Sequence, residues 1–150
     1  MLLVALIGGL IECFRWGLLA ARRRTGRLGP RRLAQMTTED GCIFCSIVAG
    51  NIPADVVTRT DRVLAFRDLN PQAPTHVLVI TTDHHRDVGE LAAADPQALA
   101  ELVTVGAEVA RKEAGGPFRL VFNTGAEVGQ SVFHVHGHVM AGRSFGWPPG

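Results

Sequence analysis

Three histidines alternate with small apolar residues near the end of the chain. They are His134, His136 and His138, separated by Val135 and Gly137. Because successive side chains of a strand point to opposite faces, this spacing places all three imidazoles on one face of one strand. A single histidine there would usually be a hydrogen-bonded core residue, but three leave that face too polar for a dry core. The pattern therefore indicates a site that does chemistry.

Two chemistries suit three imidazoles in this arrangement. A neutral imidazole nitrogen can attack an electrophilic centre and form a covalent intermediate, which divides one displacement into two. Alternatively, the histidines bind a catalytic metal ion whose bound water is the nucleophile. The triad by itself leaves both open.

A pair of cysteines forms a second constellation. Cys42 and Cys45 have the spacing of a zinc knuckle, and two thiolates need two further ligands to complete a tetrahedral site. A redox pair with this spacing usually opens a helix in a βαβ unit, which is absent here. The third cysteine, Cys13, has no partner. An odd count without a convincing secretory signal predicts a reducing, cytoplasmic environment in which disulfides do not form.

The elements that must position these residues begin after Met36. Short strand patterns alternate with two helical patterns, which predicts an α+β domain. A short helix is predicted over residues 43–49. Strands are predicted over residues 56–58, 63–67, 76–80, 118–123 and 132–140, of which the first two form a hairpin.

The second predicted helix is long. Asp95 followed by Pro96 is a typical N-cap with proline at the first helical position, and Gly115 and Gly116 end the helix. Its apolar stripe is expected to consist of Leu99, Leu102, Val103, Gly106, Val109 and Ala110.

Four segments outside the triad also have informative sequences. They are residues 61–68, residues 71–80 with Pro71-Gln72-Ala73-Pro74-Thr75-His76, the stretch Gly129-Gln130-Ser131-Val132, and the ending Trp147-Pro148-Pro149-Gly150. With the triad they resemble the Hint-like branch of the histidine-triad superfamily, in its zinc-containing type, over about residues 40–150. One departure is Gly137, where the family has a bulky apolar residue. Since Gly137 faces away from the imidazoles, the departure concerns packing rather than chemistry.

The resemblance implies a fold and an assembly. The fold is an antiparallel five-stranded sheet with two helices, and the sheet extends across a homodimer. The C-terminal tail would complete the partner's site, with Trp147 near the leaving-group pocket. A tail with two prolines cannot continue as helix or inner strand, and an indole so near the terminus needs a cover. The alternative is that Trp147 folds back on its own domain.

The resemblance also implies an activity, namely hydrolysis of AMP or GMP linked to an amine, acyl or similar leaving group. His136 would be the nucleophile, and the carbonyl of His134 would hold the proton on its other ring nitrogen. His138 and His76 would donate toward the phosphoryl oxygens. The phosphate and leaving group would be held by Ser131 and the backbone of Gly129 and Gln130. The remaining nucleotide contacts would be Asp68 to the ribose, Leu69 and Phe44 to the base, Asn123 near the phosphate or leaving group, and Trp147.

For the metal, the resemblance adds His84 and His134 to Cys42 and Cys45. His85 is a rival for His84 that the sequence does not exclude. Such a zinc site is closed and structural, and it would orient His136 through the backbone of His134.

Two other functions stay open. A metal-dependent hydrolase is disfavoured because it needs neither the Gln130-Ser131 prefix nor the Trp147 ending. The other alternative is a nucleotide-binding interaction module without turnover, which would use the same residues for binding. Residues 37–150 carry eight basic and thirteen acidic side chains, so binding to nucleic acid by bulk electrostatics is not expected.

The first 36 residues form an apolar and basic extension outside the predicted domain of residues 37–150. Seven arginines follow or interrupt an apolar stretch, which is the reverse of a signal peptide. A membrane anchor through residues 2–20 has a suitable length, but Glu12 and Arg15 oppose insertion unless they pair on one helical face. We favour the alternative that translation begins at Met36.

Overall fold

The computed structural model describes residues 38–149. The expectations for residues 1–36, namely the start at Met36, the anchor and the lack of a partner for Cys13, fall outside this range. Within the range, no helix combines the length and the apolar character needed to cross a membrane.

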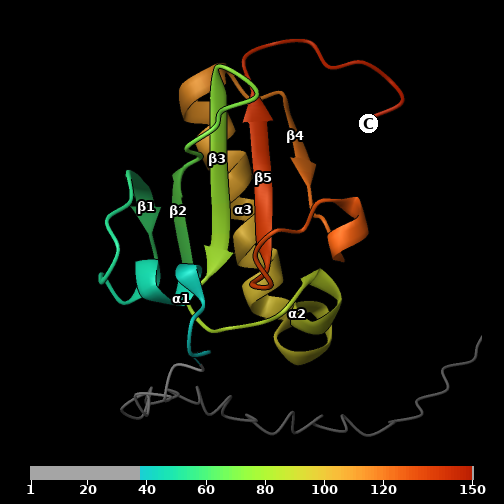
Figure 1. The fold of residues 1–150 in the computed structure, drawn as a ribbon. Coiled ribbons are helices and arrows are strands. Elements are labelled where there is room, and N and C mark those ends of the chain that lie inside the picture. The colour runs from blue at the N-terminus through green and yellow to red at the C-terminus, as the bar shows by residue number, and fades with distance from the viewer. Residues whose placement is uncertain (1–37, 150) are drawn as a thin grey trace, which may run out of the picture. The chain divides into compact units, whose positions relative to one another are not determined.

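A five-stranded antiparallel sheet forms the centre of the fold, as expected (Figure 1). Its strands are β1 (Val56–Arg59), β2 (Val63–Arg67), β3 (Thr75–Thr81), β4 (Phe118–Val121) and β5 (His136–Ala141), in the order β1-β2-β3-β5-β4. In the pairing of β3 with β5, Ile80 lies opposite His136 and Leu78 lies opposite His138. His76, two residues before Leu78, therefore shares the face of these histidines.

The described residues contain three α-helices, one more than expected. They are α1 (Ile43–Val48), α2 (Val88–Ala94) and α3 (Pro96–Ala114), with the single 3-10 turn η1 (Ala126–Val128). The unexpected helix is α2. Asp87 caps it by accepting hydrogen bonds from the backbone N–H groups of Gly89 and Glu90. An acid at the cap and a glutamate three residues later were the available sequence signal.

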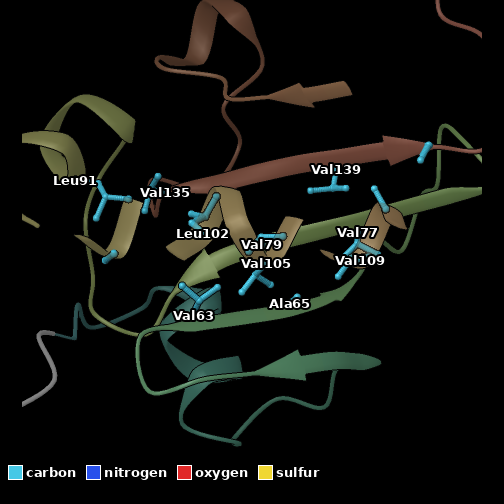
Figure 2. Close-up of a cluster of buried hydrophobic side chains, with 13 residues drawn as sticks. Val63, Ala65, Val77, Val79, Leu91, Leu102, Val105, Val109, Val135 and Val139 are labelled. Carbon is cyan, nitrogen blue, oxygen red and sulfur yellow. The ribbon is translucent and has the colours of Figure 1, made fainter. Parts of the chain in front are cut away.

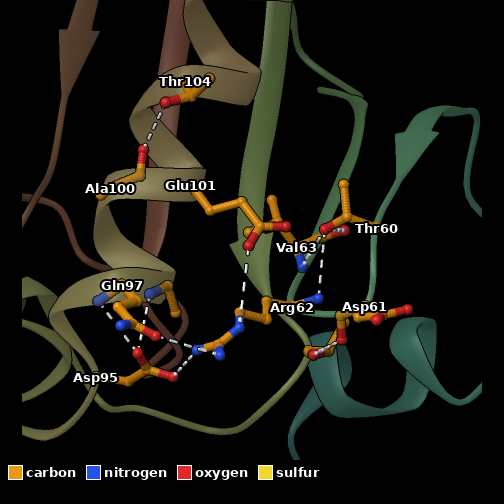
Figure 3. Close-up of polar contacts among 11 residues, drawn as sticks. Thr60, Asp61, Arg62, Val63, Asp95, Gln97, Ala100, Glu101 and Thr104 are labelled. Carbon is orange, nitrogen blue, oxygen red and sulfur yellow. Dashed lines mark hydrogen bonds and ion pairs between the residues drawn. The ribbon is translucent and has the colours of Figure 1, made fainter. Parts of the chain in front are cut away.

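The start of α3 is fixed by a polar network around Asp95 (Figure 3). The Asp95 carboxylate accepts hydrogen bonds from the N–H groups of Gln97 and Ala98. Arg62, in the turn between β1 and β2, contacts the same carboxylate at 2.7 Å. The Ala98 N–H lowers the pKa of Asp95, and Arg62 acts in the same direction. The network therefore ties the hairpin to the N-terminus of the long helix.

Helix α3 covers one face of the sheet, and the core lies between them (Figure 2). The helix contributes Ala98, Leu102, Val105, Gly106, Val109 and Ala110 to the buried side. The predicted stripe was wrong at Val103, which is 39% exposed, while Val105 is buried. Val103 lies about 100° around the helix from Leu102, which places it at the edge of the buried face.

Helix α1 packs against the opposite face. Its Phe44 and Val48 form a second core with Leu64, Phe66, Leu78 and Ile80 of β2 and β3. The triad imidazoles lie on this side, since the Phe44 ring meets those of His134 and His136 edge-on. The sheet is thus buried on both faces, and the histidines belong to the smaller core.

The last strand is shorter than the predicted span of 132–140, and the fourth strand ends at Val121 instead of Asn123. His134 and Val135 precede β5, because the Val135 N–H bonds the carbonyl of His85 at 2.7 Å instead of a neighbouring strand. The alternation of faces nevertheless holds. Val135 belongs to the core under α3, and His134 is fully buried.

Gly137 leaves no void in the core under α3. A Cβ built at this position would lie 2.9 Å from Leu120 Cδ1, 3.1 Å from Phe122 Cε1 and 3.2 Å from Leu102 Cδ2. Neighbouring side chains therefore fill the space that a larger residue would take.

Gly137→Val should consequently destabilise the protein by about 1–3 kcal/mol through overpacking. Urea unfolding of the variant measures the effect. Gly146→Val is the matched control, since a Cβ at Gly146 meets nothing within 4 Å. An unchanged unfolding midpoint for Gly137→Val would show that the core repacks freely around the added side chain.

Candidate functional site

His136 is held in one tautomer by the chain itself. Its Nδ1 lies 2.7 Å from the carbonyl oxygen of His134, a distance and pairing that require the proton on Nδ1. The imidazole is 5% exposed, and Phe44 supports it with ring centroids 5.3 Å apart. With Nδ1–H donated, Nε2 carries a lone pair. The geometry is that of a fixed imidazole nucleophile.

His76 and His138 form a hydrogen-bonded pair beside it. Their facing atoms, His76 Nε2 and His138 Nδ1, lie 3.0 Å apart. The other ring nitrogen of His76 determines which ring donates, because the backbone N–H of Gln72 donates to His76 Nδ1 at 3.0 Å. His76 therefore carries its proton on Nε2 and donates to His138 Nδ1. In neutral His138 the remaining proton is then on Nε2.

Asp68 lies next to this pair. Its Oδ2 is 3.5 Å from His76 Nε2 and 3.8 Å from His138 Nδ1, while Oδ1 accepts a hydrogen bond from the Asn70 N–H. The carboxylate is 17% exposed, so it faces both the imidazole pair and solvent.

Burial keeps the histidine pair neutral in the free protein. The pKa of His138 is lowered to about 4, chiefly by burial and then by His136 and His76, whereas Asp68 acts in the opposite direction. Burial also lowers the pKa of His76, again against Asp68. At pH 7 the relay from Gln72 through His76 to His138 is thus a chain of neutral donors.

The cysteine pair meets two histidines on the other side of His134. Ligand atoms of Cys42, Cys45, His84 and His134 all lie within 4.8 Å of one another. His134 Nδ1 is 3.6 Å from both sulfurs, and His84 Nδ1 is 3.4 Å from the Cys45 sulfur. A tetrahedral ion with ordinary Zn–S and Zn–N bond lengths requires an S to N separation of about 3.5 Å. The four side chains therefore form a set that could hold a metal ion, with His84 rather than His85 in the cluster.

Both histidine tautomers suit metal binding. His134 Nε2 donates to the Thr81 carbonyl at 2.9 Å, and His84 Nε2 donates to the Glu39 carboxylate at 2.6 Å. Each Nδ1 is thereby left with its lone pair toward the sulfurs. Burial lowers the pKa of His134 to about 4, which keeps it neutral, as a metal ligand must be.

The histidines of the other cluster are less suited to a metal ion. Asp68, His76 and His138 also converge within 4.8 Å. However, the Gln72 N–H occupies the lone pair of His76 Nδ1, so Nε2 is protonated and has no lone pair for an ion. The triad imidazoles also have different partners. His134 faces the sulfurs, His136 bonds the His134 carbonyl, and His138 bonds His76. This arrangement disfavours a catalytic metal held by the triad.

The segment before the triad is held by Gln130. Its buried side chain accepts from the Gly125 N–H and donates to the carbonyls of Arg86 and Val132. Ser131 and Gly129 are exposed beside it, and the Asn123 side chain would lie 3.8 Å from a Cβ at Gly129. Since the Gln130 amide is engaged within the chain, this segment offers outside partners its backbone and Ser131.

The other predicted contacts differ in exposure. Phe44 is buried, whereas Leu69 is fully exposed and Trp147 is 87% exposed. A cleft of about 310 Å³ lies between residues 39–43 and Ser131–Phe133. One wall includes Cys42 and the other includes Phe133, which precedes His134. The cluster of cysteines and histidines therefore connects the two walls.

Sequence reasoning missed several positioning groups, the Thr81 carbonyl that orients His134 among them. Glu39 orients His84, and nothing in its sequence context distinguishes it from the neighbouring Asp40. Gln72 acts through its backbone N–H, which no residue type reveals. Arg143 supports Gln72 from the tail by donating to its carbonyl from Nε and Nη2, at 3.1 and 3.0 Å.

Known proteins resemble this chain in sequence and in fold. The family model described as the HIT domain matches residues 49–145. An uncharacterized HIT-like protein of Synechocystis is 48% identical over 112 residues, which cover 72% of this chain and 96% of that protein. The purine nucleoside phosphoramidase of Escherichia coli is 42% identical over 106 residues, covering 69% and 89%. The structure of a HIT family hydrolase from Clostridium thermocellum superposes with a TM-score of 0.69 at 35% identity, covering 73% and 96%.

Proposed function

Because this chain belongs to the HIT domain family, we propose that it is a purine nucleotide phosphoramidase acting through a covalent nucleotidyl-histidine intermediate. The observation that carries the proposal is the 2.7 Å bond from His136 Nδ1 to the His134 carbonyl, which leaves a lone pair on Nε2. The Escherichia coli phosphoramidase, at 42% identity, supports the substrate class. The substrates would be AMP or GMP joined to an amine, acyl or similar group.

In this proposal His136 Nε2 attacks the phosphorus, and the leaving group departs. The His134 carbonyl holds the Nδ1 proton while the ring gains positive charge. His138, supported by His76, donates toward the phosphoryl group as charge develops there. Water then hydrolyses the intermediate and regenerates the neutral imidazole.

The nucleotide contacts remain those expected from the resemblance. Asp68 would accept hydrogen bonds from the ribose hydroxyls, and Leu69 and Phe44 would flank the base. Ser131, Asn123 and the backbone of Gly129 and Gln130 would hold the phosphate and the leaving group. The full exposure of Leu69 is consistent with a side chain that a ligand covers.

The test is incubation with adenosine 5′-phosphoramidate, with separate measurement of AMP and of the intact protein mass. We expect release of AMP and, on rapid acid quenching, a fraction of protein heavier by one adenylyl group. Tight binding of AMP without product release would instead support the alternative of a nucleotide-binding module without turnover.

We further propose that Cys42, Cys45, His84 and His134 hold a structural zinc ion. Two thiolates and two neutral imidazoles are a ligand set that zinc prefers, and it leaves no position for substrate. When bound, the ion would supply charge that stabilises the two thiolates. The chain's own contribution is to fix both histidine tautomers through Glu39 and Thr81.

Glu39→Ala should therefore lower the zinc affinity by about 10- to 100-fold, because it removes the acceptor that orients His84. Competition with a chromophoric chelator measures this without any activity assay. Glu39→Gln keeps an acceptor and should retain most of the affinity, and Asp40→Ala is the control for loss of a neighbouring acid. Equal affinity for Glu39→Ala and wild type would show that His84 needs no such support.

The active unit is proposed to be a homodimer in which the tail completes the partner's site. The tail is held to its own chain as far as residue 146. The Gly146 carbonyl accepts from Arg119, and the Phe145 ring centroid lies 4.9 Å from the Arg119 guanidinium carbon and 4.1 Å from that of Arg143. Trp147 beyond it is exposed, which supports a cover from outside this chain.

Deleting residues 147–150 should change the preference among leaving groups far more than the rate of attack at phosphorus. The kcat/KM ratio for two phosphoramidates with different amines measures this. Mixing the truncated chain with His136→Ala should restore some full-specificity turnover, because a hybrid dimer pairs an intact His136 with an intact tail. A monomer by light scattering at micromolar concentration would exclude the shared site.

A further inference from the structure

We propose that Asp68 is the counter-ion of protonated His138, so that one carboxylate serves both the ribose and the acid that assists the leaving group. The inference rests on the proposed phosphoramidase function and gives Asp68 a second role within it. Asp68 acts through His138 and is therefore a positioning residue.

The argument begins with a restriction on His76. The Gln72 N–H points at His76 Nδ1, so that nitrogen accepts and the proton stays on Nε2. In the neutral pair, His76 Nε2–H donates to His138 Nδ1 across 3.0 Å. If His138 gains a second proton, its Nδ1–H faces the Nε2–H of His76, so two donors meet. His76 cannot accept that proton without turning Nδ1–H against the Gln72 N–H.

Asp68 offers an acceptor for that proton. Its Oδ2 is 3.8 Å from His138 Nδ1 and 3.5 Å from His76 Nε2, so a small displacement allows it to accept from both rings. The groups that face His138 are His136 on its own strand, His76 on β3 and Asp68 after β2. Asp68 is the one with negative charge. The Asp68 carboxylate therefore favours the protonated form of His138.

A nitrogen leaving group makes this proton necessary. His138 is neutral in the free protein at pH 7, so it takes the proton from water when the phosphate anion of the substrate binds beside it. As the His136 Nε2 lone pair forms the new bond to phosphorus, the P–N bond breaks and its electron pair goes to the leaving amine. That amine takes the Nε2 proton of the His138 imidazolium, which becomes neutral, while the His136 ring becomes the cation. In the second half, water attacks phosphorus and gives a proton to His138, and the P–N bond to His136 returns its pair to Nε2. The atoms and charges balance over the two steps.

The same carboxylate remains open to the sugar. The Asn70 N–H engages Oδ1 at 2.8 Å, and an ionised carboxylate has about four acceptor positions. Ribose hydroxyls that donate to Asp68 would fix its orientation toward the histidine pair. The sugar contact and the acid function should therefore be coupled rather than independent.

The test compares two leaving groups in the Asp68→Asn variant, which has nearly the same shape but no charge. Adenosine 5′-phosphoramidate needs a proton on its leaving nitrogen, whereas the p-nitrophenyl ester of AMP loses a stable phenolate that needs none. We expect kcat for the phosphoramidate to fall by about 10- to 100-fold and kcat for the ester to change by less than about threefold. KM should rise equally for both, because both contain the same ribose.

Controls separate this inference from the proposed function. Asp55→Asn removes one exposed carboxylate that pairs with Arg67, and it should leave both substrates unaffected. Asp68→Ser is a second neutral variant in case Asp68→Asn does not fold. Equal losses of kcat on both substrates would overturn the counter-ion role and leave Asp68 as a ribose contact. If wild-type protein hydrolyses neither substrate, the proposed function itself fails.

Discussion

Replacing His136 with alanine should reduce turnover of adenosine 5′-phosphoramidate by at least about 10³-fold, because removal of a covalent nucleophile leaves no alternative route of comparable rate. The affinity for AMP should change little. The nucleotide contacts that we propose come from Asp68, Leu69 and the segment around Ser131. Single-turnover kinetics and calorimetric titration with AMP measure the two effects separately.

His85→Ala is a matched control, since it removes an imidazole that belongs to neither histidine cluster. It should retain turnover within a few-fold of wild type. The adenylyl adduct seen after acid quenching of wild type should be absent from His136→Ala and present in His85→Ala. Near-normal hydrolysis by His136→Ala would falsify the covalent mechanism.

Replacing Cys42 with serine should remove the metal and lower the thermal stability together. A structural zinc ion contributes about 10–16 kcal/mol of binding free energy in small domains, and part of this is free energy of folding. The Cys42 thiol also caps helix α1 by accepting from the Cys45 N–H at 3.5 Å. We expect a decrease in Tm of more than about 10 °C, which corresponds to roughly 3 kcal/mol for a domain of this size.

Metal analysis of purified wild type should give one zinc ion per chain, and the variant should contain much less than one. In the full 150-residue chain, Cys13→Ser is the control, because it removes a thiol outside the ligand set. Loss of the metal should also reduce kcat, since His134 supplies both the Nδ1 ligand and the carbonyl that holds His136. A stable, active wild-type protein without zinc would assign His134 a purely polar role.

Local rules were sufficient for much of the fold. The hairpin of β1 and β2, the cap at Asp95 and the end of α3 at Gly115 follow from turn, capping and periodicity rules that involve residues close in sequence. These local rules gave wrong predictions where contacts between distant residues determine the structure. Val103 matched the helical stripe but lies at its exposed edge. The residues just before His136 are not part of the strand, because the Val135 N–H bonds the His85 carbonyl.

The sequence by itself determined that the three histidines share one face, because a two-residue repeat keeps side chains on the same side of an extended chain. Only the tertiary structure placed His84, rather than His85, in the cluster with the two sulfurs, since that depends on where a loop brings each ring. It also decided the tautomers. The partners that fix them are the carbonyls of His134 and Thr81, the N–H of Gln72 and the carboxylate of Glu39. Three of these four are backbone groups, which every residue carries, so their role depends on position in space and has no counterpart in residue type.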